Sequence, residues 1–169
     1  MRIVVAGLAV VVLAACQFGA EDRTRLAENG IVLEVPSGWS VTGFSVDVTP
    51  RRLVAASYDV RPADVEGDCG GQAAIQRLPR DGAYVLLIDY GSFNVDRDDF
   101  SADLPTSGRN EPFRNERFAE FECFGPSYLF RFVVRGRHLQ AHLGVGPDAT
   151  EERRAEAVQV LNSITVERE

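Results

Sequence analysis

The chain has 169 residues, 45% of them hydrophobic and 25% charged, which is typical of one globular domain and argues against a disordered or collagen-like protein. The formal net charge of −7 argues against nucleic acid as a partner. All 18 basic residues are Arg, so Schiff-base chemistry on a lysine is excluded.

Residues 1–15 have the pattern of a bacterial signal peptide. Arg2 supplies the positive start, and the apolar run at 3–13 is too short to span a bilayer as a stable helix. Leu13-Ala14-Ala15-Cys16 resembles a lipobox, after which a lipoprotein signal peptidase cuts. The resemblance implies that Cys16 carries lipid and holds the protein on the extracytoplasmic side of a bacterial membrane. The alternative is an ordinary secretory signal with a chance cysteine.

The mature chain begins with polar residues. Residues 16–27 lack apolar periodicity and predict a lipidated tether, so we expect a single domain over 28–169. Loose alternation at 30–35 and at 39–46, on either side of a Pro-Ser-Gly turn, predicts a β-hairpin.

The middle of the chain predicts two inner strands and a short helix. Residues 53–60 are apolar at their centre, and 83–90 is the most apolar stretch of the mature chain. Because the latter is too short for a core helix, both segments predict strands. Apolar residues at helical spacing predict a short helix over 72–78, which Pro79 ends.

One connection is unusually long. Residues 91–116 join two predicted strands through polar residues, and loops of this length are usually either functional or disordered. Its Asn and Asp residues match the opening spacing of a calcium loop, but the Gly and Glu that the motif requires are missing, so we predict no metal site. The residues that we select as a candidate partner-binding surface are Phe93, Asp96, Asp98, Asp99 and Phe100.

Three segments at 117–124, 128–134 and 137–145, separated by glycine-containing turns, predict an antiparallel meander. His138 and His142 share one face of the third strand, about 13 Å apart at roughly 3.3 Å per residue, which is too far for one metal ion. We therefore predict ordinary, half-exposed histidines.

The C-terminal segment predicts a helix and a last short strand. Apolar residues at helical spacing place the helix over 149–162, with Asp148 and Glu151 as a capping box, and 164–166 as a strand. The predicted fold class is α+β, an antiparallel sheet with the C-terminal helix and the short helix packed on one face.

With Cys16 assigned to lipid, Cys69 and Cys123 are left as the pair for an intrachain disulfide in an oxidising compartment. Closing a loop of that length stabilises a fold by roughly 4 kcal/mol in the chain-entropy model. The alternatives are two free thiols or a pair of metal ligands, and neither has His or Cys neighbours at ligand spacing.

The run Val35-Pro36-Ser37-Gly38-Trp39, followed by strands, a helix and Ser163-Ile164, resembles PsbP-type domains and LpqN-type actinobacterial lipoproteins. The resemblance covers the start and the end of the body, and the Cys69 and Cys123 pair is not part of it. It implies an antiparallel sheet with helices packed against it that serves binding and not chemistry. No functional residue carries over.

Catalytic motifs are missing from the sequence, which has no Gly-x-Ser-x-Gly elbow, no cysteine to spare and no phosphate-binding loop. The leading hypothesis is a non-enzymatic binding or interaction module of the cell envelope, without a cofactor or metal. Lipid would hold it to the membrane, and an envelope protein or a small ligand would be its partner. The alternative is an envelope hydrolase that uses carboxylates, namely the loop acids with Asp89.

Overall fold

The computed structural model describes residues 23–43, 50–65, 71–91, 100, 118–121, 123 and 125–167. The elements, in chain order, are β1 (Arg23–Glu28), β2 (Ile31–Pro36), β3 (Ser40–Gly43), β4 (Arg51–Ala56), the short 3-10 helix η1 (Pro62–Asp64), α1 (Gln72–Gln76), β5 (Ala83–Asp89), β6 (Phe118–Phe121), β7 (Gly125–Val134), β8 (Arg137–Val145), α2 (Glu151–Asn162) and β9 (Thr165–Val166).

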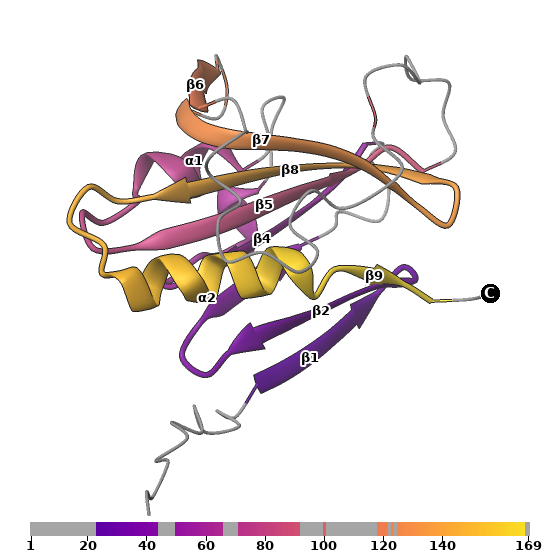
Figure 1. Ribbon diagram of the computed structural model, residues 1–169, viewed down its shortest axis with the longest axis horizontal. Helices are drawn as coiled ribbons and strands as arrows, with labels where there is room; N and C mark the ends of the chain where they lie inside the picture. The colour runs from indigo at the N-terminus through magenta and orange to yellow at the C-terminus, as the bar shows by residue number, and fades with distance from the viewer. Residues whose placement is uncertain are drawn as a thin grey trace, which may run out of the picture.

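The strands form two antiparallel sheets, and helix α2 lies between them (Figure 1). The small sheet has the order β1-β2-β9, and the large sheet has the order β3-β4-β5-β8-β7-β6. Helix α2 contacts β2 on one side and β5 and β8 on the other. The fold class is α+β, as the sequence predicts, with the strands divided between two antiparallel sheets where one was expected.

The small sheet begins with a strand that we did not predict. Residues 23–27, assigned to the tether, belong to β1, which pairs with β2 across Asn29 and Gly30. Both turn residues have positive φ, 51° and 75°, as in the tight two-residue turn for which Asn-Gly is the preferred sequence. Most of β1 is exposed and polar, so it lacks the alternation that marks a strand.

The predicted hairpin of 30–35 with 39–46 is wrong. Strand β2 pairs with β1 and β9 in the small sheet, whereas β3 pairs with β4 in the large sheet. The turn between β2 and β3, in which the Trp39 N–H donates to the Pro36 carbonyl at 3.2 Å, leads the chain from one sheet to the other. Trp39 is buried and its Nε1 donates to Glu156 of α2 at 3.3 Å.

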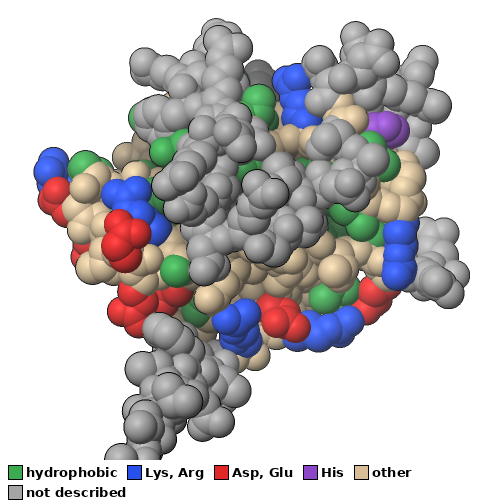
Figure 2. All heavy atoms as spheres, viewed as in Figure 1, with side chains coloured by type: hydrophobic (Ala, Val, Ile, Leu, Met, Phe, Trp, Pro, Cys, Tyr) green, Lys and Arg blue, Asp and Glu red, His purple; other side chains and the backbone are tan. Residues whose placement is uncertain are grey.

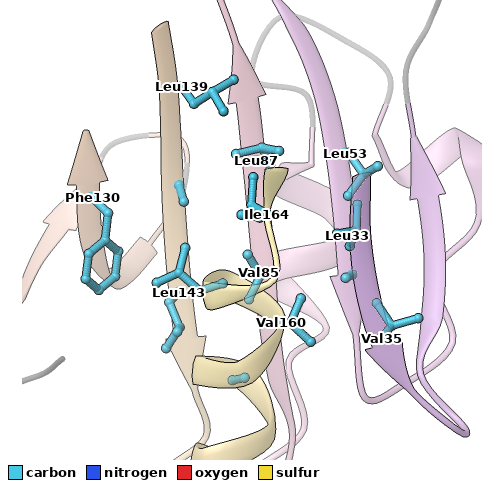
Figure 3. Close-up of a cluster of buried hydrophobic side chains, with 14 of the residues drawn as sticks. Leu33, Val35, Leu53, Val85, Leu87, Phe130, Leu139, Leu143, Val160 and Ile164 are labelled. Atoms are coloured by element: carbon cyan, nitrogen blue, oxygen red, sulfur yellow. The ribbon is translucent and has the colours of Figure 1, made fainter. Parts of the chain in front are cut away.

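Strand β5 is buried along its whole length between β4 and β8, as expected for a central strand. Its alternate residues belong to two separate apolar clusters. Val85 and Leu87 face α2 and the small sheet, and we call this the inner face of the large sheet (Figure 3). Leu86 and Ile88 face α1 on the opposite side, which we call the outer face.

The two helices therefore lie on opposite faces of the large sheet, not on one face as predicted. Helix α2 contributes Val160 to the inner core, whereas α1 contributes Ile75 to the outer cluster. The predicted cap of α2 also differs. Thr150 accepts the first-turn backbone N–H, and Asp148 instead pairs with Arg80.

The predicted meander is confirmed, because β6, β7 and β8 are consecutive neighbours in the sheet. Arg135 and Gly136 join β7 to β8 with φ values of 50° and 78°, a two-residue turn that fixes the strand register. On the outer face, this register pairs Leu129 with His142, Arg131 with Gln140, and Val133 with His138.

Candidate functional site

Polar side chains gather on the outer face of the large sheet, where β7 and β8 lie. Ser127 comes from β7, and His138, Gln140 and His142 alternate along β8. All four are buried, with relative exposures between 0% and 8%. Buried polar groups destabilise a fold unless they have hydrogen-bond partners. The hydrogen bonds of these four residues therefore show which of them are available for chemistry or binding.

Three of these residues and Arg131 form one hydrogen-bonded chain. Arg131 Nε donates to Gln140 Oε1 at 3.1 Å. Gln140 Nε2 lies 2.8 Å from His142 Nε2, and His142 Nδ1 lies 3.1 Å from Ser127 Oγ. The direction of the chain follows from Arg131, because a guanidinium only donates. Gln140 accepts at Oε1 and donates from Nε2, so His142 accepts at Nε2 and carries its proton on Nδ1.

This direction is the wrong one for serine catalysis. His142 already donates its Nδ1 proton to Ser127, so it cannot take the hydroxyl proton, which is the step that makes a serine nucleophilic. Burial, together with the charge of Arg131, lowers the pKa of His142 to about 4, which keeps the imidazole neutral. Ser127 and His142 are each 0% exposed. This row of hydrogen bonds is therefore a structural feature of the large sheet.

A second group surrounds Tyr90 beside this chain. Arg52 of β4 and Arg131 of β7 lie in the same row of the sheet, with β5 and β8 between them. Tyr90 and His138 are neighbours, and the Tyr90 N–H donates to the His138 carbonyl at 3.0 Å. Burial raises the pKa of Tyr90, and the positive charges of Arg131 and Arg52 act against that rise. We call these residues the Arg131 cluster: Arg52, Tyr90, Arg131, His138 and Gln140.

Phe100 is the member of the candidate loop surface that falls within the described residues, and it lies against the Arg131 cluster. Its ring makes edge contacts with His138, at a centroid distance of 5.2 Å, and with Tyr90, at 6.3 Å. The long loop therefore contacts the outer face at this point. The other candidate residues, Phe93, Asp96, Asp98 and Asp99, lie outside the described residues, and their role stays a prediction.

The prediction of half-exposed histidines is wrong. His138 is 8% exposed and His142 is 0% exposed, and Gln140 lies between them along the strand. His142 has partners on both ring nitrogens, whereas Nδ1 of His138 is buried without a hydrogen-bond partner. In the described part of the chain, no three His, Cys, Asp or Glu residues lie close enough together to hold a metal ion.

Asp89, the strand acid of the hydrolase hypothesis, lies on the inner face, away from Phe100. It is 2% exposed and forms an ion pair with Arg137. Arg137 Nη1 also donates to the Asn29 carbonyl of the small sheet at 2.5 Å. The positive charge of Arg137, which links the two sheets, thus balances the Asp89 carboxylate. Asp89 does not act together with Phe100 or the Arg131 cluster, which lie on the other face.

The cysteines give less information. Cys16 and Cys69 lie outside the described residues, and Cys123 is half-buried between β6 and β7. Lipidation of Cys16 and pairing of Cys69 with Cys123 stay predictions. Among the described helices, none is long and apolar enough to cross a membrane.

Comparison with known proteins finds no match for this chain among protein-family models, curated proteins or solved structures. The likeness to PsbP-type and LpqN-type domains therefore rests on the quoted residues alone. Any function must be argued from the chemistry of the site.

Proposed function

We propose that this chain is a lipid-anchored, non-enzymatic binding module of the bacterial cell envelope, and that its binding surface is the long loop at 91–116 together with the Arg131 cluster. The observation that carries the proposal is the contact of Phe100 with His138 and Tyr90, because it brings the loop onto the polar end of the outer face.

The anchor is supported by the lipobox and by the short distance from it to the domain. Cys16 and Arg23, the first residue of β1, are seven positions apart, which an extended chain spans with at most about 25 Å. A lipid on Cys16 would therefore hold the small sheet near the membrane. Acidic and basic side chains alternate along the margin of this sheet (Figure 2), with Arg25 and Glu167 paired at 2.5 Å, which suits a hydrated position above the lipid.

Binding is favoured over catalysis by the state of the two strongest catalytic candidates. Asp89 is neutralised by Arg137 in the inner core, and Ser127 faces a histidine that holds its proton on the wrong nitrogen. The Arg131 cluster, in contrast, combines two cations, a phenol and an imidazole beside a long loop. Convergent polar groups next to a long loop are typical of binding sites.

The anchor is tested by expressing the full chain in a bacterium and separating detergent and aqueous phases. We expect the native protein in the detergent phase, with an acylated N-terminal cysteine in its mass spectrum, and Cys16→Ser to lose both properties. A cleaved, water-soluble native protein with an unmodified Cys16 would contradict the lipid anchor.

The binding role is tested by crosslinking in cells, followed by mass spectrometry. The native protein is compared with a variant in which 93–110 is replaced by a short Gly-Ser linker. Arg80→Ala serves as the control, because Arg80 is exposed and pairs with Asp148, outside the loop and the Arg131 cluster. We expect a specific neighbour with the native and control proteins and none with the loop variant. Equal crosslinks from the loop variant would remove the loop from the binding surface.

A further inference from the structure

His138 carries an unexplained feature of the outer face. Its side chain is more than nine-tenths buried, and Nδ1 has no hydrogen-bond partner. Buried polar atoms are nearly always paired, and an unpaired one costs free energy unless something else satisfies it. Because His138 lies beside Tyr90 and under the edge of Phe100, a ligand held between these side chains would supply that partner.

The side-chain charges around His138 indicate the charge that such a ligand would carry. Neighbouring strands are about 4.8 Å apart, so the backbones of Arg52 and Arg131 lie roughly 14 Å apart across three strand spacings. Both positive charges oppose the rise in the pKa of Tyr90 that burial causes, so the charge at this end of the outer face favours an anion. The bond from Arg131 Nε to Gln140 fixes the plane of the guanidinium, and such a fixed group recognises a carboxylate through two parallel bonds.

Apolar side chains beside the arginine define the rest of the ligand. Leu129 and Val133 flank Arg131 on the outer face of β7, and both are only partly buried. The ring of Phe100 adds an apolar wall above His138. An anion that is polar at one end and aliphatic along its length matches this combination better than a fully hydrated ion does.

We infer that the Arg131 cluster binds an aliphatic monocarboxylate. Its carboxylate would accept from Arg131 and from His138 Nδ1, and its hydrocarbon chain would lie along Leu129, Val133 and Phe100. This inference rests on the proposed binding function and names the class of ligand for the same site.

The test uses sodium octanoate as the probe and titrates it calorimetrically into the lipid-free mature chain. Octan-1-ol, which lacks the carboxylate, and inorganic phosphate, which lacks the hydrocarbon, are the matched compounds. We expect octanoate to bind at least ten-fold more tightly than either. Equal binding of octanol would overturn the carboxylate contact, equal binding of phosphate would overturn the apolar contact, and no octanoate binding at millimolar concentration would overturn the inference.

The site is located with variants and with the unchanged protein. We expect Arg131→Met and His138→Phe each to weaken octanoate binding at least ten-fold, and Arg80→Met to leave it unchanged. Since Arg131→Met also breaks the bond to Gln140, backbone amide shifts of the native protein provide a measurement that does not depend on a variant folding. Octanoate should move the Tyr90 and His138 amides and leave those of α2 in place, and the reverse pattern would overturn the site.

The outcomes separate this inference from the proposed function. Loop-dependent crosslinks without octanoate binding would overturn the carboxylate ligand and leave the binding module intact. Absence of both the loop-dependent crosslinks and octanoate binding would overturn both the binding module and the carboxylate ligand.

Discussion

His142 owes its tautomer to Arg131, although the two residues are not adjacent in the row of hydrogen bonds. Arg131 can only donate, so it sets the amide orientation of Gln140, which in turn sets the tautomer of His142 and the direction of the bond to Ser127. One cation thus orders three buried polar groups. Without the burial that the fold provides, His142 would titrate like any exposed histidine.

The low pKa of His142 predicts a pH dependence of stability. Above pH 6.5 the imidazole is neutral in the folded and unfolded states, so it adds no pH dependence. Between pH 6.5 and about 4 the unfolded chain binds a proton that the folded protein does not, so the free energy of unfolding falls as the pH falls. The full effect is about 3 kcal/mol, at 1.36 kcal/mol per pKa unit.

This dependence is measured by urea unfolding at pH 7 and pH 5, on the native protein and on His142→Asn. We expect the native protein to lose about 2 kcal/mol more than the variant over this interval, because the other titrating groups are common to both. Equal losses would show that His142 is not held neutral by burial.

Strands β5 and β8 fit together through a difference in side-chain size. Tyr84 and Gly144 are cross-strand partners, and the buried Tyr84 ring covers the position where Gly144 has no side chain. A Cβ on Gly144 would lie 2.1 Å from Tyr84 Cε1, closer than any real contact. The glycine is therefore required by the aromatic ring opposite it and not by its backbone conformation.

Gly144→Ala should lower the free energy of unfolding by about 2 kcal/mol, the usual magnitude for overpacking a core. In a Tyr84→Ala background the same substitution should cost much less, because the ring that it collides with is gone. Urea unfolding of the four proteins gives the coupling energy. An equal cost in both backgrounds would assign the effect to the backbone of Gly144.

At the scale of the whole molecule, most strands were predictable from sequence, but their distribution over two sheets was not. The meander of β6, β7 and β8 follows from local alternation and glycine-containing turns. The pairing of β2 and β3 was mispredicted because a turn reverses the chain without specifying which strands pair. Strand β1 was missed because it is polar, although Asn29-Gly30 is a strong hairpin signal.

The site was predictable to a similar degree. The two-residue turn at Arg135 and Gly136 fixes the register of β7 and β8, so the pairing of Arg131 with Gln140 could have been derived from sequence. The burial of His138 and His142 could not, because alternation shows which residues share a face but not what covers that face. The separation of Asp89 from Phe100 also required the three-dimensional fold.

Arg137 holds the two sheets together at the end of β5. It pairs with buried Asp89 of the large sheet and donates to Asn29 of the small sheet. Arg137→Met would leave the Asp89 carboxylate buried without its cation, so we expect the free energy of unfolding to fall by about 3 kcal/mol. Adding Asp89→Asn should restore part of this loss. A neutral effect of Arg137→Met in urea unfolding would show that the pair does not join the sheets.

The predicted disulfide would act on the opposite side of the large sheet. Helix α1 contacts β7, and a Cβ on Gly125, two residues after Cys123, would lie 3.8 Å from Cγ2 of Ile75, six residues after Cys69.

We expect labelling of the unreduced, denatured Cys16→Ser protein to find no free thiol, and Cys69→Ser to expose one at Cys123. Reduction should then lower the free energy of unfolding by roughly 4 kcal/mol, because it releases a long loop in the unfolded chain. Two labelled thiols in the unreduced protein would contradict the bond. In that case reduction would leave the free energy of unfolding unchanged.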